Sequence, residues 1–470
     1  MVLSLLKEKL MWQIICNDGQ SMKKYFNFLL LLSAVSILIL SCNRNDDESV
    51  PRFPEGSRES VNQWVQDSMK KYYYWADQMP AKPDYHLPVK DFFKSLLSSQ
   101  DRFSFAVDSK DPSSYPRSVR NMYGFDYTVI QLANGSVVTT VKLVMKNSPA
   151  FNSGLERGMI ITKINGKAIT AANAEELTSS IKDQTVIELT VGNWENDFVI
   201  NEKNITVYYG YSFEQPLESK IFEKNGKKTG YLYIYDFPDG MTSALNQKFA
   251  AFKAAGIQDL IIDIRYNYGG SVASAAALCS LIPSGITSSS PFIIYKGNKN
   301  GGEVKRTFAQ QISYDANALD FNSLRANALG LGKVYILTST STASASEIVI
   351  NNLKPYMQVI QVGGVTLGKD MAGFMVEDKR NPKKISWQLH PVIYKVFNAN
   401  GEGAYSNGIP PQIAAGEYAS LPLLPLGDPE ETLISSALNT IYSKSAGKNA
   451  LDQSVKILFQ SDTPSAAIGK

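Results

Sequence analysis

Residues 260–281 read LIIDIRYNYGGSVASAAALCSL, the clearest strand-to-helix pattern in the chain. Its first five residues are apolar except for Asp263, which is typical of a strand buried on both faces of a sheet. Gly269 and Gly270 allow a tight turn, and the small residues 272–281 continue as a helix. A buried strand followed at once by a helix is the repeating unit of α/β layers.

The same alternation extends to both sides of this stretch. We expect further strands at 231–234, 334–337 and 359–362, and further helices at 244–254 and 344–353. Residues 206–440 are therefore predicted to form one α/β unit, the largest of the chain.

The amino terminus has the pattern of a targeting segment. Residues 22–42 read MKKYFNFLLLLSAVSILILSC, with two lysines before 16 apolar-rich residues, which is too short for a spanning helix. Its end resembles the bacterial lipoprotein signal, which implies cleavage after residue 41 and lipidation of Cys42. Residues 1–41 are then a signal peptide, with Met22 as the plausible true start. An ordinary secretory signal or an uncleaved anchor is the alternative.

Residues 42–57 are a polar tether that is too hydrophilic to pack. Its acidic run, 46–48, resembles the surface-export signal of Bacteroidetes lipoproteins, although a plain linker would look the same. The resemblance implies an outer-membrane lipoprotein in the envelope of a Gram-negative bacterium, attached through Cys42 and facing the periplasm or the surface.

Composition excludes several functions. The 470 residues are 44% hydrophobic and 19% charged, as in a globular chain, and the net charge of +3 is too small for nucleic-acid binding through bulk charge. Three cysteines exclude a disulfide scaffold, and two histidines argue against a multi-histidine metal site. We expect no metal, no cofactor and no nucleic-acid partner, and the oligomeric state is left open.

Two further units precede the large one, and a tail follows it. Residues 58–118 have helical periodicity interrupted by prolines and are predicted to form a small helical cap. Residues 119–205 contain expected strands around SPAFNSGLERGMIITKINGKAI (148–169), with a tight turn at Asn165-Gly166. Residues 441–470 are assigned as a carboxy-terminal tail.

The order of elements in 119–205 resembles a PDZ domain. The resemblance implies a carboxylate-binding loop at Tyr123-Gly124-Phe125. In that mode a peptide adds as an extra strand, while amides of the loop hold its terminal carboxylate.

Two segments of the large unit contain residues that are suited to catalysis. STSTASASE (339–347) lies between an expected strand and helix, so a hydroxyl there would sit where amides and the helix dipole favour negative charge. A run of helix-capping residues is the alternative. Lys369 follows Gly368 after another strand, and a desolvated neutral lysine can serve as a base where no histidine is at hand. A solvated surface lysine is the alternative.

DIRYNYGG (263–270), TASASE (342–347) and a Gly-Lys pair whose lysine lies 25 residues after Ser344 resemble the carboxy-terminal processing, or tail-specific, serine peptidases. The cap motifs YYYWADQMP (72–80) and DRFSF (101–105) look like Bacteroidetes lipoprotein members. The resemblance covers residues 58–440 and implies a crotonase/ClpP-like α/β core. It assigns Ser344 as nucleophile, Lys369 as general base, and the amides of Ala345 and of Gly269 or Gly270 as the oxyanion hole.

The sequence departs from the family pattern at Gly373, where many members have a glutamine that orients the lysine. The orienting group is therefore left open. Alternative assignments remain: Ser341 or Ser346 as the hydroxyl, a Ser–His arrangement using His86 or His390, and Glu347 as a helix cap in preference to a base.

The prediction is thus a lipid-anchored serine endopeptidase that cleaves polypeptides after PDZ capture of a carboxyl terminus. A catalytically inactive peptide-binding lipoprotein is the second hypothesis, since the lysine neighbourhood is altered. A glycan-binding surface lipoprotein is a third and rests only on the lipidation signal and the acidic tether.

Overall fold

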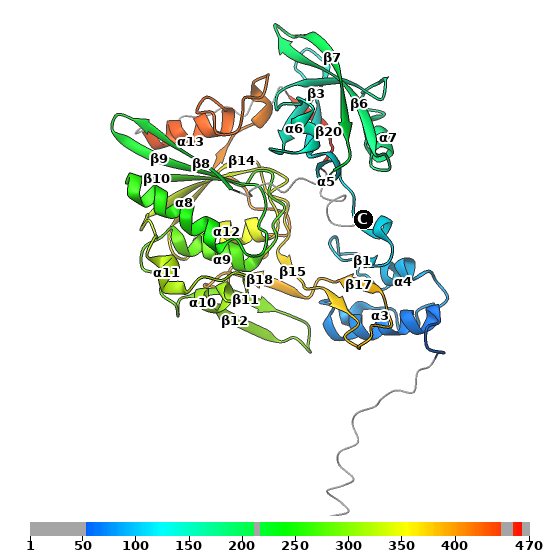
Figure 1. The fold of residues 1–470 in the computed structure, drawn as a ribbon. Helices are drawn as coiled ribbons and strands as arrows, with labels where there is room; N and C mark the ends of the chain where they lie inside the picture. The colour runs from blue at the N-terminus through cyan, green and yellow to red at the C-terminus, as the bar shows by residue number, and fades with distance from the viewer. Residues whose placement is uncertain (1–52, 211–216, 443–454, 463–470) are drawn as a thin grey trace, which may run out of the picture. The chain divides into compact units, whose positions relative to one another are not determined.

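The computed structural model of the chain describes residues 53–210, 217–442 and 455–462 (Figure 1). The predicted signal peptide, Cys42 and the first part of the tether lie outside these residues. The described residues from 61 onward form one compact unit, which contains the features discussed below except the first three residues of a helix that begins at Arg58. Within the described ranges, no helix has both the length and the apolar character needed to cross a membrane.

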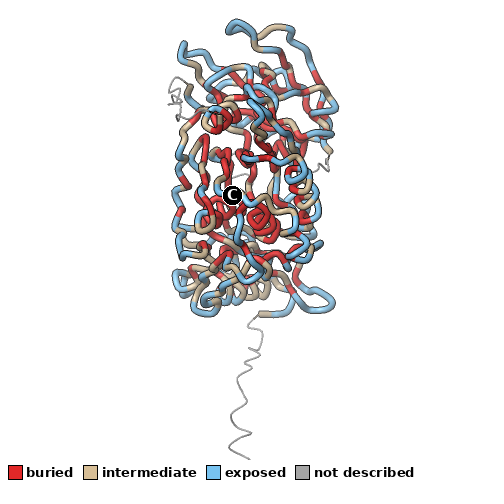
Figure 2. Tube along the Cα trace, turned by 90° about the vertical axis from the view of Figure 1, so that its left-hand side faces the viewer, coloured by how far each residue is buried: buried red, intermediate tan, exposed pale blue. Residues whose placement is uncertain are grey.

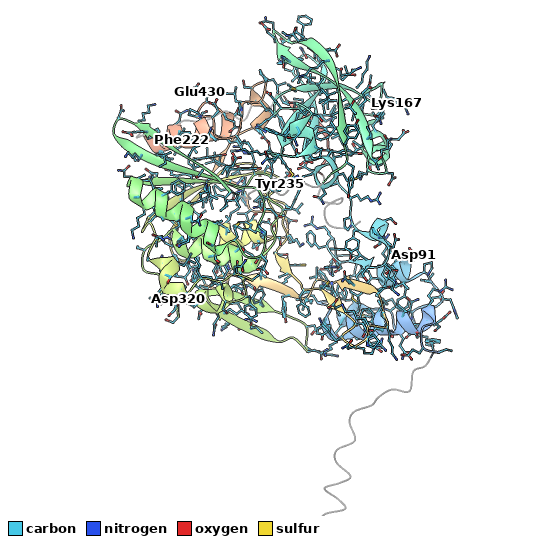
Figure 3. All side chains as sticks on the ribbon, in the orientation of Figure 1. Asp91, Lys167, Phe222, Tyr235, Asp320 and Glu430 are labelled. Atoms are coloured by element: carbon cyan, nitrogen blue, oxygen red, sulfur yellow. The ribbon has the colours of Figure 1, made fainter. Side chains whose placement is uncertain are left out.

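The core of the predicted α/β unit is a six-stranded sheet. Its order is β19-β14-β13-β10-β9-β8, parallel throughout except for the antiparallel pair β8–β9. The strands are β8 (Leu217–Lys224), β9 (Lys227–Ile234), β10 (Asp259–Asp263), β13 (Lys333–Thr338), β14 (Gln358–Gly363) and β19 (Ile413–Ala414). Figure 3 labels Phe222 on β8 and Tyr235 just after β9.

Helices cover both faces of this sheet, as Figure 1 shows. On one face lie α8 (Thr242–Ala255), α9 (Val272–Leu281) and α12 (Ala345–Leu353), and on the other lies α13 (Thr432–Tyr442). Successive residues of β10 alternate between the two layers: Ile262 packs with the first group and Ile261 with α13. The buried strand expected from the sequence is confirmed, since all five residues of β10 are buried. Figure 2 colours the whole tube by burial, with buried segments in the interior.

A second, four-stranded sheet flanks this core, in the order β12-β11-β18-β15. It consists of β11 (Pro291–Lys296), β12 (Glu303–Thr307), β15 (Met371–Ala372) and β18 (Tyr394–Phe397), with α10 (Phe308–Ile312) and α11 (Phe321–Arg325) nearby in sequence. The sequence analysis did not predict these elements, because they are short and lack a clear period.

The cap is built from two distant parts of the chain. Its helices are α3 (Arg58–Tyr72) and α4 (Val89–Ser95), and its small sheet runs β1-β17-β16. Strand β1 (Phe105–Asp108) comes from the predicted cap, whereas β16 (Val376–Glu377) and β17 (Trp387–His390) come from the segment assigned to the large unit. The boundaries read from the sequence therefore miss this exchange, because strand pairing across nearly 300 residues leaves no local pattern.

We call residues 119–205 the middle unit. It holds β2 (Phe125–Gln131), β3 (Val137–Val144), β4 (Ile160–Ile164), β5 (Lys167–Ala168), β6 (Val186–Glu195) and the start of β7 (Phe198–Tyr208), with helices α5 (Val119–Tyr123), α6 (Pro149–Asn152) and α7 (Ala174–Ile181). These strands form one sheet with β20 (Lys456–Gln460), which pairs with β2. Part of the segment assigned as a tail is therefore an ordered strand of the middle unit's sheet.

Candidate active site

Ser344 occupies the residue just before helix α12, with φ 56° and ψ −117°. This backbone conformation is costly for a residue with a side chain and tends to occur at functional sites. Gly269 packs directly against it, since a Cβ on Gly269 would lie 2.7 Å from the Ser344 Cβ and 2.9 Å from the Ala345 amide nitrogen. The three predicted residues are thus together at the start of a helix, where the dipole favours negative charge.

The amides around Ser344 differ in their availability. The Gly269 amide donates to Asn267 Oδ1 at 2.7 Å, so it is already occupied. The amides of Ala345 and Gly270 make no hydrogen bond within the described residues. These two amides are therefore the predicted donors that remain open to a developing oxyanion.

The loop with Gly269 is anchored by a buried arginine at the end of β10. Arg265 is fully buried and donates to Asp263 Oδ2 at 2.9 Å and to the two carboxylate oxygens of Glu431 at 2.6 and 2.9 Å. The Ser339 hydroxyl donates to the Arg265 carbonyl, which joins this loop to the one that precedes Ser344. The motif at 263–270 therefore has a structural function in placing the glycines.

Lys369 follows Gly368, which has φ 90°. A Cβ added at this position would overlap the Ser406 carbonyl oxygen, so only glycine fits there. The Lys369 side chain is half-buried, with Nζ 5.3 Å from the centre of the Phe103 ring. Burial lowers the pKa of the Lys369 amine below its usual value, although the carboxylates of Glu347 and Asp101 oppose the shift.

Glu347 joins the backbones of the two predicted catalytic residues. Its Oε2 accepts the amides of Ser344 at 3.0 Å and Lys369 at 2.7 Å, while its Oε1 accepts the Gly368 amide at 2.7 Å and the Thr366 hydroxyl at 2.5 Å. The Glu347 side chain is fully buried. Burial raises the pKa of its carboxyl group, and the four hydrogen bonds oppose this shift without cancelling it. The predicted helix cap is present in the bond to Ser344, but the contacts to residues 366–369 were not foreseen.

The Ser344 hydroxyl and the Lys369 amine do not hydrogen-bond to each other among the described residues. Such bonds are often long in a site without substrate and tighten when substrate binds. The shared Glu347 carboxylate holds the backbone amides of the two residues.

The cap completes the surroundings of the lysine. The Arg102 guanidinium donates to the carbonyls of Gly368 and Ser406, both at 3.1 Å. A cavity of about 310 Å³ lies beside Lys369. Its mostly apolar lining includes Phe103, Phe105, Met371, Phe374, Met375 and His390.

Gly373 lines the same cavity and explains the missing glutamine. A Cβ on Gly373 would overlap the carbonyl oxygen of Pro391, so no larger side chain fits without a backbone shift. The charged groups that act on the Lys369 amine are instead Glu347 and Asp101.

The alternative residues fall into different surroundings. Ser346 is fully buried and donates to the Asn267 carbonyl at 3.1 Å, and Ser341 is buried and donates to Asp462. His86 is exposed in the cap. His390 stacks on Phe105 at 4.4 Å between ring centres, in the cavity beside the lysine, and burial followed by the lysine's charge lowers its pKa.

The predicted carboxylate loop lies in the middle unit. Tyr123 ends α5 and donates its hydroxyl to the Ile181 carbonyl at 2.8 Å. Gly124 has φ 84°, and its amide donates to the Arg120 carbonyl at 2.9 Å, while Phe125 opens β2. The Gly124 amide is thus engaged in ending the helix.

No cluster of three or more potential metal-ligating side chains is found in the part of the chain that the structure describes.

A strained serine at a helix start and a lysine whose pKa is lowered by burial, both carried by an α/β sheet, are the groups that a serine hydrolase of layered fold would use. Residues 228–415 match the family model described as "Peptidase family S41", and residues 60–105 match "Peptidase S41 N-terminal domain". Residues 228–415 thus match a domain of peptidase family S41, and residues 60–105 match the N-terminal domain of the same family.

Relatives and solved structures agree with this family. The chain is 26% identical over 366 residues to a CtpA-like serine protease of Staphylococcus aureus, covering 73% of this chain and 66% of that protein. It is 24% identical to the carboxy-terminal processing protease CtpA of Bacillus subtilis, over 73% and 69% of the two chains. An S41 protease structure from Bacteroides fragilis aligns with TM-score 0.64 and 26% identity, covering 80% of this chain and 96% of that chain. The match thus spans just under two thirds of the staphylococcal relative.

Proposed function

We propose that the chain is a serine endopeptidase of the carboxy-terminal processing type, with Ser344 as nucleophile and Lys369 as general base. The observation that supports this most directly is the Glu347 carboxylate, one oxygen of which accepts the amides of both residues. The family match and the relatives' names support peptide bonds as the target.

In this proposal the neutral Lys369 amine takes the proton of the Ser344 hydroxyl as its oxygen bonds to the peptide carbonyl carbon. The amides of Ala345 and Gly270 stabilise the oxyanion. The C–N bond then breaks, Lys369 gives its proton to the leaving amine, and an acyl-serine remains. Water, deprotonated by the same lysine, releases the new carboxylate and restores the serine.

The cavity beside Lys369 supports a preference near the cut. Its lining is mostly aromatic and aliphatic, and about 310 Å³ is enough for one large side chain. We expect an apolar substrate residue next to the scissile bond. The middle unit, in turn, binds substrate carboxyl termini in the manner of a PDZ domain.

A peptide library digested by the wild type and by Ser344→Ala tests the proposal. The wild type should produce cleavages that Ser344→Ala loses by about 10⁴-fold or more. Ser346→Ala is the matched control, since it removes a neighbouring hydroxyl of the same helix and should cut at the wild-type sites. Turnover by Ser344→Ala, or no turnover by any of the three proteins, would contradict the proposal. The second outcome would favour the inactive peptide-binding lipoprotein.

The proposed location is the outer membrane of a Gram-negative bacterium, through acyl chains on Cys42. Multiple chains are needed for firm anchoring, because a single one binds weakly and reversibly. Cys42→Ala should therefore move the protein to the soluble fraction and abolish lipid labelling. Membrane retention of Cys42→Ala, with no lipid label in the wild type, would mean that the apolar segment is itself the anchor.

A further inference from the structure

The chain adds one of its own strands to the middle unit. Strand β20 pairs antiparallel with the outer edge of β2, in the register Thr128 with Gln460 and Gln131 with Lys456. Beyond the strand, the Ser461 amide donates to the Tyr127 carbonyl at 3.0 Å, and the Tyr127 amide donates to Ser461 Oγ at 2.9 Å. A peptide that adds to a sheet edge makes this kind of ladder.

Apolar contacts hold one side of the added strand. Leu458 and Phe459 pack against the core of the middle unit, and the Phe459 ring lies 6.1 Å from the Tyr127 ring. Ile457 is 47% exposed. The strand thus presents a bound side and an open side, as a peptide ligand does.

The segment ends on a buried charge cluster. Asp462 forms ion pairs with Lys142 of β3 and, at 3.5 Å, with Arg120 of α5, and all three side chains are at most 5% exposed. Burial opposes ionisation of Asp462, but the two cations outweigh it and lower its pKa. Arg120 also pairs with the buried Asp126, so it keeps a charged partner when Asp462 is removed, whereas Lys142 would lose the carboxylate that it pairs with. A buried cation without a partner costs several kcal/mol, so this place favours a carboxylate beside Lys142.

The same aspartate contacts both loops of the active site. Its carboxylate accepts the Ser341 hydroxyl at 2.8 Å, three residues before Ser344. Its backbone carbonyl accepts the hydroxyl of Tyr268, the residue before Gly269. A change of occupant at this carboxylate position would therefore be felt by the loops that carry the nucleophile and the glycines.

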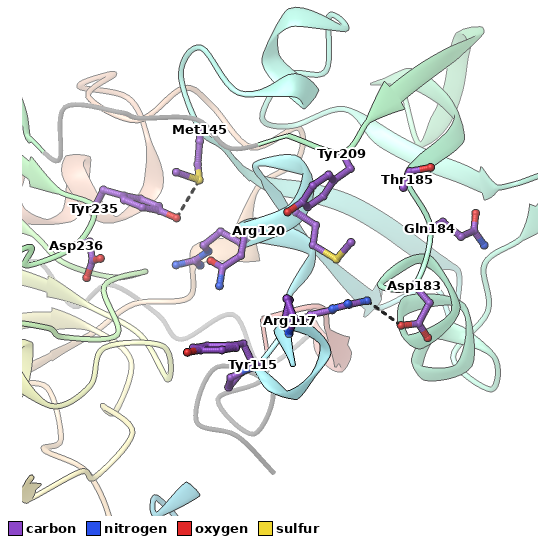
Figure 4. Close-up of a pocket in the computed structure, with 14 residues that line it drawn as sticks. Tyr115, Arg117, Arg120, Met145, Asp183, Gln184, Thr185, Tyr209, Tyr235 and Asp236 are labelled. Carbon is purple, nitrogen blue, oxygen red and sulfur yellow. Dashed lines mark hydrogen bonds and ion pairs between the residues drawn. The ribbon is translucent and has the colours of Figure 1, made fainter. Parts of the chain in front are cut away.

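One of the two cations, Arg120, also borders a cavity. Arg120 lines a cavity of about 900 Å³, and Figure 4 shows it on the cavity wall with Tyr235 and Arg117. The Arg120 Nη1 donates to the Tyr266 carbonyl at 2.8 Å, so the guanidinium is held in place from the large unit. The cavity therefore meets the cation pair at Arg120, whereas Lys142 and Asp462 do not line it.

We propose that Lys142 and Arg120 form a binding site for the carboxylate of a polypeptide terminus, and that residues 456–462 occupy it in the resting protein. A substrate terminus enters by displacing this segment from β2. That the incoming ligand is a substrate terminus rests on the proposed peptidase function. That residues 456–462 occupy the site does not depend on that function.

The test measures binding in the full chain with Ser344→Ala, which removes hydrolysis. The probe is a fluorescent heptapeptide with the sequence of residues 456–462, Lys-Ile-Leu-Phe-Gln-Ser-Asp, read by anisotropy. Phe459→Ala in the protein weakens the internal strand, so the probe should bind about tenfold more tightly than to the parent. Ile457→Ser, on the open side of the same strand, is the matched control and should leave the affinity unchanged.

A second variant tests the cations without leaving a buried charge unpaired. The pair Lys142→Gln with Asp462→Asn, placed in the Phe459→Ala protein, should lose about tenfold or more in probe affinity. A probe with asparagine in place of its aspartate and an amidated end should bind the Phe459→Ala protein as weakly. Retention of circular dichroism and hydrogen exchange by each variant shows that it is folded.

Equal affinity of the probe for the parent and the Phe459→Ala protein would overturn the proposal. So would full affinity for the asparagine probe. The two failures are distinguishable: if the wild type cuts no peptide but the probe binds as expected, only the peptidase function is wrong. If peptides are cut and the affinities do not differ, only the internal occupant is wrong.

Discussion

Replacing Glu347 by glutamine tests whether one buried carboxylate holds the nucleophile and the base in place. One oxygen accepts the amides of Ser344 and Lys369, and the other accepts the Gly368 amide and the Thr366 hydroxyl. Glutamine has one oxygen, so its NH₂ group must face two of these four donors.

The loss of stability in Glu347→Gln can be worked out from the four hydrogen-bond donors that the carboxylate accepts. The Thr366 hydroxyl can rotate, but the Gly368 amide cannot, so one buried donor loses its acceptor at about 1–3 kcal/mol. The remaining bonds lose the carboxylate charge, which weakens each by about 1 kcal/mol. Two bonds remain on the oxygen, so we expect Glu347→Gln to lower the free energy of unfolding by about 3–5 kcal/mol, measured by urea denaturation.

The pH dependence of kcat gives a second readout. The rate should rise with pH as Lys369 becomes neutral, at a pKa that burial lowers and that the carboxylates of Glu347 and Asp101 raise. His390, whose own pKa is lowered by burial and by the lysine's charge, lines the same cavity. Removing the Glu347 charge lowers the Lys369 pKa further, so the rising limb should move to lower pH. We expect kcat on a fluorogenic peptide to fall at its plateau with KM little changed.

Asn352→Ala is the matched control on the same helix. Asn352 donates to the Phe292 carbonyl at 2.9 Å, so its loss should destabilise the chain by about 1–3 kcal/mol. Asn352→Ala should leave the rising part of the kcat–pH profile at the same pH as in the wild type. If Glu347→Gln leaves both kcat and the limb at their wild-type values, the carboxylate does not position the dyad.

Three further predictions concern the lysine and its supports. Asp101→Asn keeps an acceptor oxygen but removes a charge that raises the Lys369 pKa, so its kcat limb should also move to lower pH; a move to higher pH would contradict the assigned sign. Gly373→Ala forces a Cβ into the Pro391 carbonyl oxygen and should lower the free energy of unfolding by about 1–3 kcal/mol. Gly416→Ala, whose Cβ would have no atom within 4 Å, should lower it by less than about 1 kcal/mol, and equal losses in thermal unfolding would contradict the steric account. Arg265→Lys leaves buried carboxylates short of donors and should cost about 3–5 kcal/mol in urea unfolding; a loss under about 1 would show the network to be dispensable.

The sequence was sufficient for the elements with a strong local pattern. The strand at 259–263, the helix at 272–281 and the serine before helix α12 appear where the alternation and the polar loop predicted them. Ser344, Ala345 and Gly269 or Gly270 were assigned together through the resemblance to the peptidase family, and the structure places Gly269 against Ser344 and Ala345.

What the sequence could not show depends on contacts between distant segments. Glu347 looked like an ordinary helix cap, and nothing near it in sequence indicates that its second oxygen receives the amide of Gly368. Arg102 and Phe103 reach the lysine across more than 260 residues. Strand β20 follows a segment without a clear period, and its partner β2 lies over 300 residues earlier.

Labelling with a fluorophosphonate, followed by mass spectrometry of the labelled peptide, tests the central claim most directly. Only an activated serine reacts, so the label should be found on Ser344 in the wild type and should be absent from Ser344→Ala. Lys369→Ala and Lys369→Arg should both lose it, since neither provides a neutral amine. A label on Ser346, or labelling of Lys369→Ala at the wild-type rate, would contradict the dyad.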